Sequence, residues 1–394
     1  MGSPQGPEVY DAAAYFIEAA DWIVWQLSGK ATRNTCTAGY KGMWHKKDGY
    51  PSKEFFTLLN PRLANFVDEK LNYPIVPLGH RVGGLTAGMA RRTGLKEGTA
   101  VVSGNVDAHV TIPAAKILGA GKMLAIMGTS TCHIVLDTEE RAVPGICGVV
   151  EDGVYPGFFA YEAGQSCVGD HFAWFIDNCL PEQYVREARE SGKNIHVYLR
   201  EKAEKLAPGE SGLVALDWWN GNRSVLVDVD LTGVMLGMTL QTKPEDMYRA
   251  LIEATAYGTR KIVETYKQHG VPVDEFIASG GISQKDPMTM QIYADVLGIP
   301  VRIAASRQGP ALGSAIFAAV AAGVEHGGYA DIVAAAEKMG QLKDVVYTPD
   351  PRAQAMYDRL YAEYEILHDY FGRGANDAMK RLKDIRKQAL QMKK

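Results

Sequence analysis

Residues 101–136 read VVSGNVDAHVTIPAAKILGAGKMLAIMGTSTCHIVL, and the rest of the chain can be arranged around this stretch. A buried strand is expected to end at Val102, and Asp107 follows the next turn, at the start of a helical pattern that runs to Leu118. Two short apolar runs then flank Gly-Thr-Ser-Thr at residues 128–131. This spacing predicts a β-hairpin whose tip offers backbone amides and hydroxyls, which are groups that suit a phosphate.

The composition is that of an ordinary globular protein. Its 394 residues are enough for two or more domains, and 42 basic residues against 46 acidic ones give a net charge of −4. This balance argues against a nucleic-acid-binding protein, because such proteins carry a strongly basic surface. No apolar run approaches the length of about 18 residues that a membrane-spanning helix needs, so no membrane partner is expected.

The five cysteines are odd in number and widely spaced, and none forms a Cys-x-x-Cys pair. This pattern indicates neither a disulfide framework nor a zinc site, and it favours the reducing cytoplasm. No residue is assigned as a metal ligand. Residues 1–7 contain no apolar segment of the kind found in signal peptides, and we interpret them as a leader outside the fold.

Strands and helices alternate in the second half of the chain. A long amphipathic pattern at residues 243–269 predicts a helix, and the residues after it predict two strands and two helices, at 276–278, 288–297, 301–303 and 309–323. Such alternation predicts an α/β fold with a largely parallel or mixed sheet, whose ligands lie beyond the carboxyl ends of the strands. Near the N-terminus, residues 10–27 predict one helix that Gly29 ends.

The residues themselves leave several alternatives open. Asp107 is equally well placed to accept a proton in a cleft or to cap a helix. The hairpin tip and Gly280–Gly281 are either ordinary turns or contacts to a nucleotide. His109 and His133 are interpreted as packed side chains, since no second ligand stands at metal spacing. Residues 218–224, WWNGNRS, look like an exposed loop and a candidate recognition element.

Four segments, taken in order, resemble the FGGY family of carbohydrate kinases. SGNVDAHV resembles the segment of the catalytic aspartate, GTSTC a phosphate motif, SGGISQKDPMTMQIYADVLGIPV the adenosine motif, and GPALGSAIFAAVAAG the closing helix. YEAGQSCVGD and WWNGNRS look most like the L-ribulokinases of that family. The resemblance runs from residue 9 to about residue 374. It implies the actin-like, ribonuclease H-like ATPase fold.

The resemblance also implies a reaction, the ATP-dependent phosphorylation of L-ribulose to L-ribulose 5-phosphate in arabinose breakdown. Asp107 would act as general base on the 5-hydroxyl, and Mg²⁺ would bridge the phosphates. Lys41 and Glu162 would join Asp107 in holding the ketopentose. The residues implied for ATP are Gly128, Thr129 and Ser130 at the phosphates, and Gly169, Gly280, Gly281 and Gln284 at the rest of the nucleotide.

One expected motif does not occur in the sequence. Members of the family begin with a strand-turn-strand carrying Asp-x-Gly-Thr, and none of the 394 residues forms that motif. The resemblance therefore implies an incomplete first domain at residues 8–104 and a complete nucleotide-binding domain at 105–375. The charge pattern of residues 376–394 itself predicts a basic, solvated terminal helix, with docking to a membrane or a partner as the alternative. We expect little turnover from this chain alone, and an N-terminal segment or a second copy as possible partners. A non-catalytic actin-like module and a kinase for xylulose, glycerol or gluconate are the alternatives.

Overall fold

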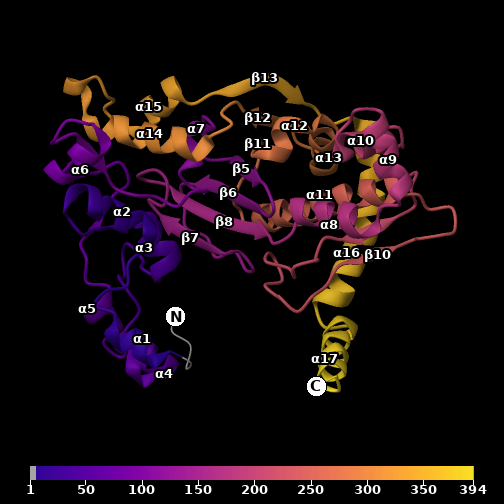
Figure 1. Cartoon of the computed structure of the whole chain (residues 1–394), viewed down its shortest axis with the longest axis horizontal. Coiled ribbons are helices and arrows are strands. Elements are labelled where there is room, and N and C mark those ends of the chain that lie inside the picture. The colour runs from indigo at the N-terminus through magenta and orange to yellow at the C-terminus, as the bar shows by residue number, and fades with distance from the viewer. Residues whose placement is uncertain (1–5, 394) are drawn as a thin grey trace.

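The computed structural model describes residues 6–393, so residues 1–5 of the expected leader and the last residue of the tail lie outside the described part. A mixed sheet of seven strands forms the centre of the molecule, in the order β13-β12-β11-β5-β6-β8-β7 (Figure 1). Strand β11 pairs in parallel with β5 and β12, whereas the other pairs are antiparallel. The strands are β5 Lys122–Met127, β6 Thr131–Asp137, β7 Gly148–Glu151, β8 Phe159–Gln165, β11 Glu275–Ser279, β12 Val301–Ala304 and β13 Leu342–Tyr347. The predicted α/β class and mixed sheet are confirmed.

The two faces of the sheet are buried by different helices. Alternate residues of a strand point to opposite faces, and in β5 Met123 and Ala125 belong to one apolar cluster while Leu124 belongs to another. The first cluster includes residues of α11 Pro244–Gln268 and α13 Pro287–Leu297. The second includes residues of α7 Thr111–Ala114, α14 Gly309–Ala322 and α15 Ile332–Met339, which run along one side of the sheet in Figure 1.

Several smaller elements complete this part of the chain. Strands β9 Val214–Leu216 and β10 Val234–Leu236 form an antiparallel pair beside α11. The remaining helices near the first face are α8 Gly169–Cys179, α9 Glu182–Glu190, α10 Ile195–Ala203 and α12 Gly281–Lys285. The predicted helices at 243–269, 288–297 and 309–323 agree with α11, α13 and α14 to within one or two residues.

The segment from residue 7 to 102 lies at one end of the molecule and adds none of the seven strands (Figure 1). Its two short strand pairs are separate sheets, one parallel and one antiparallel. The elements are α1 Pro7–Ala12, α2 Ala19–Ser28, β1 Arg33–Asn34, α3 Thr35–Gly42, α4 Lys53–Leu59, α5 Phe66–Lys70, β2 Ile75–Val76, β3 Arg81–Gly84, α6 Ala87–Thr93 and β4 Ala100–Val102.

Two predicted helices were too long. The single helix expected at residues 10–27 is divided into α1 and α2, because the Phe16 amide donates to the Lys70 carbonyl and draws the chain between them out of helical geometry. Gly29 ends α2 with φ of 72°, as expected. The helix expected from Asp107 to Leu118 is also wrong, since only α7 is helical there. Lys116 has φ of 55°, which ends the helix.

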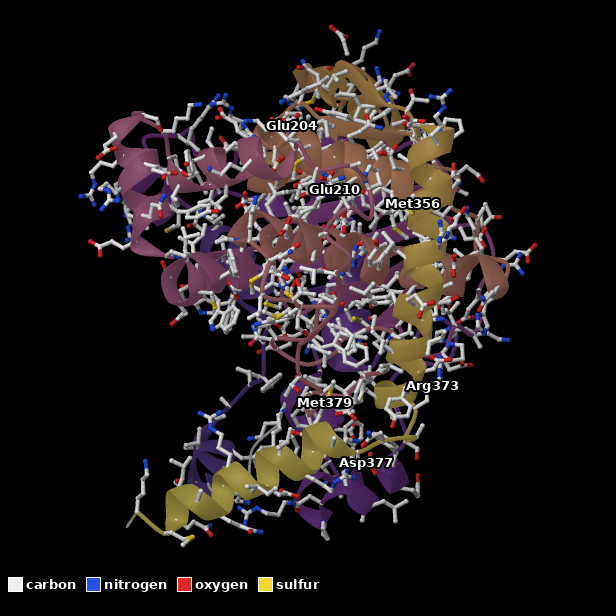
Figure 2. The ribbon with its side chains drawn as sticks, turned by 90° about the vertical axis from the view of Figure 1, so that its right-hand side faces the viewer. Glu204, Glu210, Met356, Arg373, Asp377 and Met379 are labelled. Carbon is white, nitrogen blue, oxygen red and sulfur yellow. The ribbon has the colours of Figure 1, made fainter. Side chains whose placement is uncertain are left out.

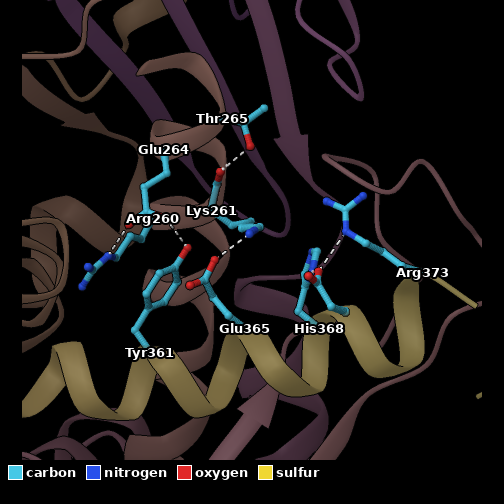
Figure 3. Close-up of polar contacts among 9 residues, drawn as sticks. Arg260, Lys261, Glu264, Thr265, Tyr361, Glu365, His368 and Arg373 are labelled. Atoms are coloured by element: carbon cyan, nitrogen blue, oxygen red, sulfur yellow. Dashed lines mark hydrogen bonds and ion pairs between the residues drawn. The ribbon is translucent and has the colours of Figure 1, made fainter. Parts of the chain in front are cut away.

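Helix α16 Pro351–Gly372 is tied to α11 by ion pairs and hydrogen bonds, some of which Figure 3 shows. Lys261 Nζ lies 2.6 Å from a carboxylate oxygen of Glu365, and the Tyr361 hydroxyl donates to Glu264 at 2.8 Å. The chain then turns, and α17 Ala378–Gln391 extends away from the body of the protein (Figure 2). None of the helices in the described part is long and apolar enough to span a membrane.

Candidate active site

The predicted β-hairpin is confirmed and sits at the edge of a cavity. Strands β5 and β6 pair in antiparallel register up to Met127 and Thr131, and the Gly128 amide donates to the Ser130 carbonyl at 2.9 Å. Gly128, Thr129 and Ser130 are exposed, in contrast to the buried strands that carry them. The tip therefore presents its backbone and two hydroxyls to a ligand while its base is held in the core.

Helix α8 begins directly against this tip. The Val168 amide donates to the Thr129 carbonyl, and the Gly169 amide donates to the Gly128 carbonyl, each at 2.9 Å. A Cβ on Gly169 would lie 2.6 Å from the Gly128 carbonyl oxygen, so only glycine fits there without a shift of the backbone. The predicted contact residue Gly169 thus has a steric reason for being glycine.

A cavity of about 370 Å³ gathers most of the predicted sugar and phosphate residues. Lys41 enters it from α3, Asp107 from the turn before α7 and Glu162 from β8. These three side chains come from distant parts of the sequence. The hairpin tip lines the same cavity, as do His109, Cys132 and Arg223. The sequence marked neither His109 nor Cys132 as a site residue, whereas Arg223 belongs to the candidate recognition loop at 218–224.

Asp107 is free for a role in the cavity. Its carboxylate accepts a hydrogen bond only from the adjacent Ala108 amide, at 2.9 Å, among the contacts of the described residues. The N-cap of α7 is Val110, so the alternative in which Asp107 caps this helix is wrong. The side chain is exposed and lines the cavity, which leaves its oxygens accessible to a substrate hydroxyl.

Glu162 is held between two partners. It lies within β8, and its side chain is only 9% exposed. Arg223 Nη2 donates to Glu162 Oε1 at 2.5 Å, and His109 Nε2 lies 3.5 Å from Oε2. Burial, with the nearby charges of Lys41 and Arg223, lowers the pKa of His109 to about 3, so its ring is neutral.

Both histidines are packed side chains, as predicted. His133 is fully buried, with Nε2 3.3 Å from the Thr259 hydroxyl, and burial lowers its pKa to about 3. His109 is 1% exposed and packs against the ring of Tyr40, with 4.3 Å between centroids. Unlike His133, it also reaches the wall of the cavity.

The loop at residues 218–224 is not exposed as the sequence suggested. Trp218 is 1% exposed, and Asn222 and Ser224 are also buried, because the aromatic bulk packs inward and two backbone hydrogen bonds join Asn222 to Asp228. Asn220 and Arg223 are the exposed residues of the loop, and the Arg223 side chain, which is 39% exposed, points to Glu162. The loop reaches the cavity through this one side chain.

A second cavity, of about 620 Å³, adjoins the first across the hairpin tip. Gly128 and Thr129 line both cavities, and Gly169 and Gly281 line the second. The sequence did not mark the other side chains around it, which include Asp170, His196, Arg200, Tyr248 and Lys285. They come from helices, where no turn or glycine pattern distinguishes them from ordinary surface residues.

Gly280 and Gln284 lie close to the second cavity but are not among its lining residues. A Cβ on Gly280 would lie 2.4 Å from the Met127 carbonyl oxygen, so this glycine lets α12 approach β5. Gln284 donates to the Ala304 carbonyl at 2.6 Å, which fixes its side chain against β12. Contact of either residue with a nucleotide stays a prediction.

No group of three or more histidine, cysteine, aspartate or glutamate side chains within residues 6–393 is arranged to hold a metal ion. Magnesium is commonly held by one or two carboxylates together with substrate phosphates and water, and does not require such a cluster. The residues at the hairpin tip are therefore compatible with a magnesium ion that the phosphates carry.

Three comparisons relate this architecture to known proteins. The family model of the C-terminal domain of FGGY carbohydrate kinases matches residues 123–322. A ribulokinase of Bacillus licheniformis is 58% identical over 97% of this chain and 69% of its own length, and one of Geobacillus thermodenitrificans is 57% identical over 96% and 67%. The crystal structure of a xylulose kinase from Rhodospirillum rubrum superposes with a TM-score of 0.76 at 27% identity, over 92% of this chain and 69% of the other.

The fold and the sequence relatives therefore agree with the resemblance that the motifs suggested. The chain belongs to the FGGY family of carbohydrate kinases, as a homologue of its ribulokinases.

Proposed function

We propose that the protein transfers the γ-phosphoryl group of ATP to the 5-hydroxyl of L-ribulose, as in the first steps of arabinose breakdown. One observation carries this proposal: the hairpin tip is shared by two cavities, one with Asp107, Lys41 and Glu162 and the other with Gly169 and Gly281. A nucleotide in the second cavity would direct its terminal phosphate across Gly128 and Thr129 toward the first. The identity of 58% to a ribulokinase supports the choice of sugar.

The chemistry assigned to the first cavity follows from its side chains. Asp107 accepts the proton of the sugar hydroxyl as that oxygen attacks the γ-phosphorus. Lys41 and Glu162 bind the other hydroxyls, one as donor and one as acceptor. Phosphoryl transfer needs mainly positioning and neutralisation of charge, so holding the acceptor beside the tip supplies much of the catalysis.

ATP and Mg²⁺ are the proposed cofactors. The amides and hydroxyls of Gly128, Thr129 and Ser130 suit phosphate oxygens, and Arg200 and Lys285 bring positive charge to the wall of the second cavity. Bound magnesium supplies neutralisation of the phosphate charge. Gly280 and Gln284 are proposed to lie near the base or ribose.

The proposed division into domains separates the sources of these residues. Lys41 belongs to residues 8–104, the sugar-binding part, whereas Asp107, Glu162 and the tip belong to residues 105–375, the nucleotide-binding part. The proposed terminal segment, residues 376–394, contains the basic helix α17. A cytoplasmic location is part of this proposal and agrees with cysteines that are all unpaired.

A polypeptide of these 394 residues is proposed to have little or no turnover by itself. It contains no Asp-x-Gly-Thr, the motif that would face the transferred group from the other side. The same observation favours a second candidate, a non-catalytic actin-like module that still binds nucleotide. Kinases for xylulose, glycerol or gluconate are weaker candidates because the relatives of highest identity reported above are ribulokinases.

A coupled assay for ADP tests this proposal with L-ribulose, xylulose, glycerol and gluconate as acceptors. We expect the chain alone to bind MgADP in a calorimetric titration and to form little product with any acceptor. Addition of the part of the B. licheniformis ribulokinase outside the matched region is expected to give turnover on L-ribulose. Turnover by the chain alone that Asp107→Asn abolishes would overturn the claim of low activity.

A further inference from the structure

We propose that Arg223 is the positioning residue of ketose recognition, because it fixes the carboxylate of Glu162 in the orientation that binds the sugar. This inference rests on the proposed function, in which Glu162 contacts the ketose. It adds Arg223 to the proposed sugar site. This residue lies 61 positions after Glu162, in the loop at 218–224. Arg223 acts through Glu162 and is not itself proposed to touch the sugar.

The contacts of the Glu162 carboxylate are unequal. Oε1 accepts from Arg223 Nη2 at 2.5 Å, a charge-assisted hydrogen bond, whereas Oε2 lies 3.5 Å from the neutral ring of His109. Neither nitrogen of His109 forms a hydrogen bond within the described residues. The guanidinium therefore decides how the carboxylate is turned, and the second oxygen is left available toward the cavity that Glu162 lines.

Arg223 is itself held in place along the length of its side chain. It crosses Gly164, where a Cβ would lie 2.9 Å from Nη1 and 3.0 Å from Cδ. Its Nε donates to Cys147 Sγ at 3.2 Å, and the next residue, Ser224, accepts from the Gly164 amide at 3.2 Å. The absence of a side chain at Gly164 gives the arginine its path across β8.

This arrangement suits recognition of a polyol. A carboxylate on a β-strand, only 9% exposed, can accept from a hydroxyl in a fixed direction only if its rotation is restrained. The guanidinium, which is planar and is fixed at Nε by Cys147, restrains it better than the single flexible ammonium of a lysine would. Loss of the guanidinium is therefore expected to weaken ketose binding and to leave the nucleotide cavity unchanged.

Ligand-observed NMR titrations of the 394-residue chain with L-ribulose, and calorimetric titrations with MgADP, test this inference. We expect Arg223→Gln to weaken L-ribulose binding about tenfold, as loss of a hydrogen bond to a charged group does, and to leave the MgADP affinity within about twofold. Arg223→Lys should recover part of the loss. Arg141→Gln is the matched control, because Arg141 is 34% exposed and pairs at 3.1 Å with the buried carboxylate of Asp137. It should change neither affinity.

A double-mutant cycle separates positioning from direct contact. If Arg223 acts through Glu162, the double variant Glu162→Gln/Arg223→Gln should bind L-ribulose as Glu162→Gln alone does, within about twofold. Separate losses that multiply in the double variant would overturn the positioning role.

The remaining outcomes distinguish this inference from the proposed function. If the unchanged chain binds no L-ribulose, or if Glu162→Gln binds it unchanged, the proposed sugar site fails and the inference fails with it. If both behave as expected while Arg223→Gln binds like the unchanged chain, or loses no more than Arg141→Gln does, only the inference is wrong.

Discussion

The amide of Gly169 donates to the carbonyl of Gly128 at 2.9 Å, so the first residue of α8 rests on the hairpin tip that separates the two cavities. The tip is thereby held from two sides, by the β5–β6 pairing and by the helix. A phosphate bound at its amides and hydroxyls would contact a rigid surface, which lowers the entropic cost of ordering the site on binding.

Gly169→Ala should weaken nucleotide binding. The added Cβ would lie 2.6 Å from the Gly128 carbonyl oxygen, so the tip must shift. We expect the MgADP affinity measured by calorimetry to fall about tenfold, since hydrogen bonds to phosphate are sensitive to such a displacement. Gly119→Ala is the control, because no atom lies within 4 Å of a Cβ there. Equal affinities for the two variants would show that the packing of Gly169 is unimportant.

Gly313→Ala should destabilise the fold near Asp107. A Cβ on Gly313 would lie 1.7 Å from the Val110 carbonyl oxygen, so α14 would have to move away from the turn that carries the aspartate. Overpacking of this kind costs roughly 1–3 kcal/mol in the free energy of unfolding, which urea denaturation measures.

The matched control for Gly313 is Gly88, another helical glycine, with open space around its Cβ position. Gly88→Ala should be neutral or raise stability by up to about 1 kcal/mol, because alanine favours a helix more than glycine does. A Gly313→Ala protein as stable as the Gly88→Ala protein would contradict the close packing of α14 on Val110.

Asp217 should make stability depend on pH. Burial raises the pKa of its carboxyl to about 6, although Gln165 and Tyr364 donate hydrogen bonds to it. The folded state then keeps a proton that the unfolded state has lost. The contribution of Asp217 to stability is complete below about pH 4 and is lost as the pH rises through 6.

Comparison with Asp217→Asn isolates this group, since the buried histidines titrate alike in both proteins. The quantity compared is the free energy of unfolding of the unchanged chain minus that of the variant. This difference should fall by up to about 3 kcal/mol between pH 4 and pH 7.5. Urea denaturation at intervals of half a pH unit measures the difference. A difference that stays constant or rises with pH would exclude the raised pKa.

Local sequence patterns predicted much of the fold. The hairpin at the tip and helices α11, α13 and α14 follow from apolar periodicity with glycine or proline at their ends, which are signals within a single segment. The helix expected after Asp107 was wrong, because Lys116 adopts a left-handed conformation that apolar spacing does not reveal.

The site was predicted only in part, because its remaining residues are distant in the sequence and only the folded chain brings them together. Lys41, Asp107 and Glu162 were carried over from family motifs and do line one cavity. The Arg223–Glu162 pair joins a loop to a strand, and the loop itself looked exposed because its tryptophans stand beside polar residues. A glycine at 164 was the one local sign that a large side chain crosses β8.

The central claim is that the chain phosphorylates L-ribulose with Asp107 as the general base. The most direct test is an assay of L-ribulose phosphorylation by the chain, to which the part of the B. licheniformis ribulokinase outside the matched region is added. With MgATP, ³¹P NMR should show a new phosphate monoester on the 5-hydroxyl, and Asp107→Asn should slow its formation by a factor of about 10² or more, as loss of a general base does. Asp107→Asn should not alter the MgADP affinity of the chain. Absence of product at every ratio of the two polypeptides, or product formed equally fast by the Asp107→Asn chain, would contradict the account.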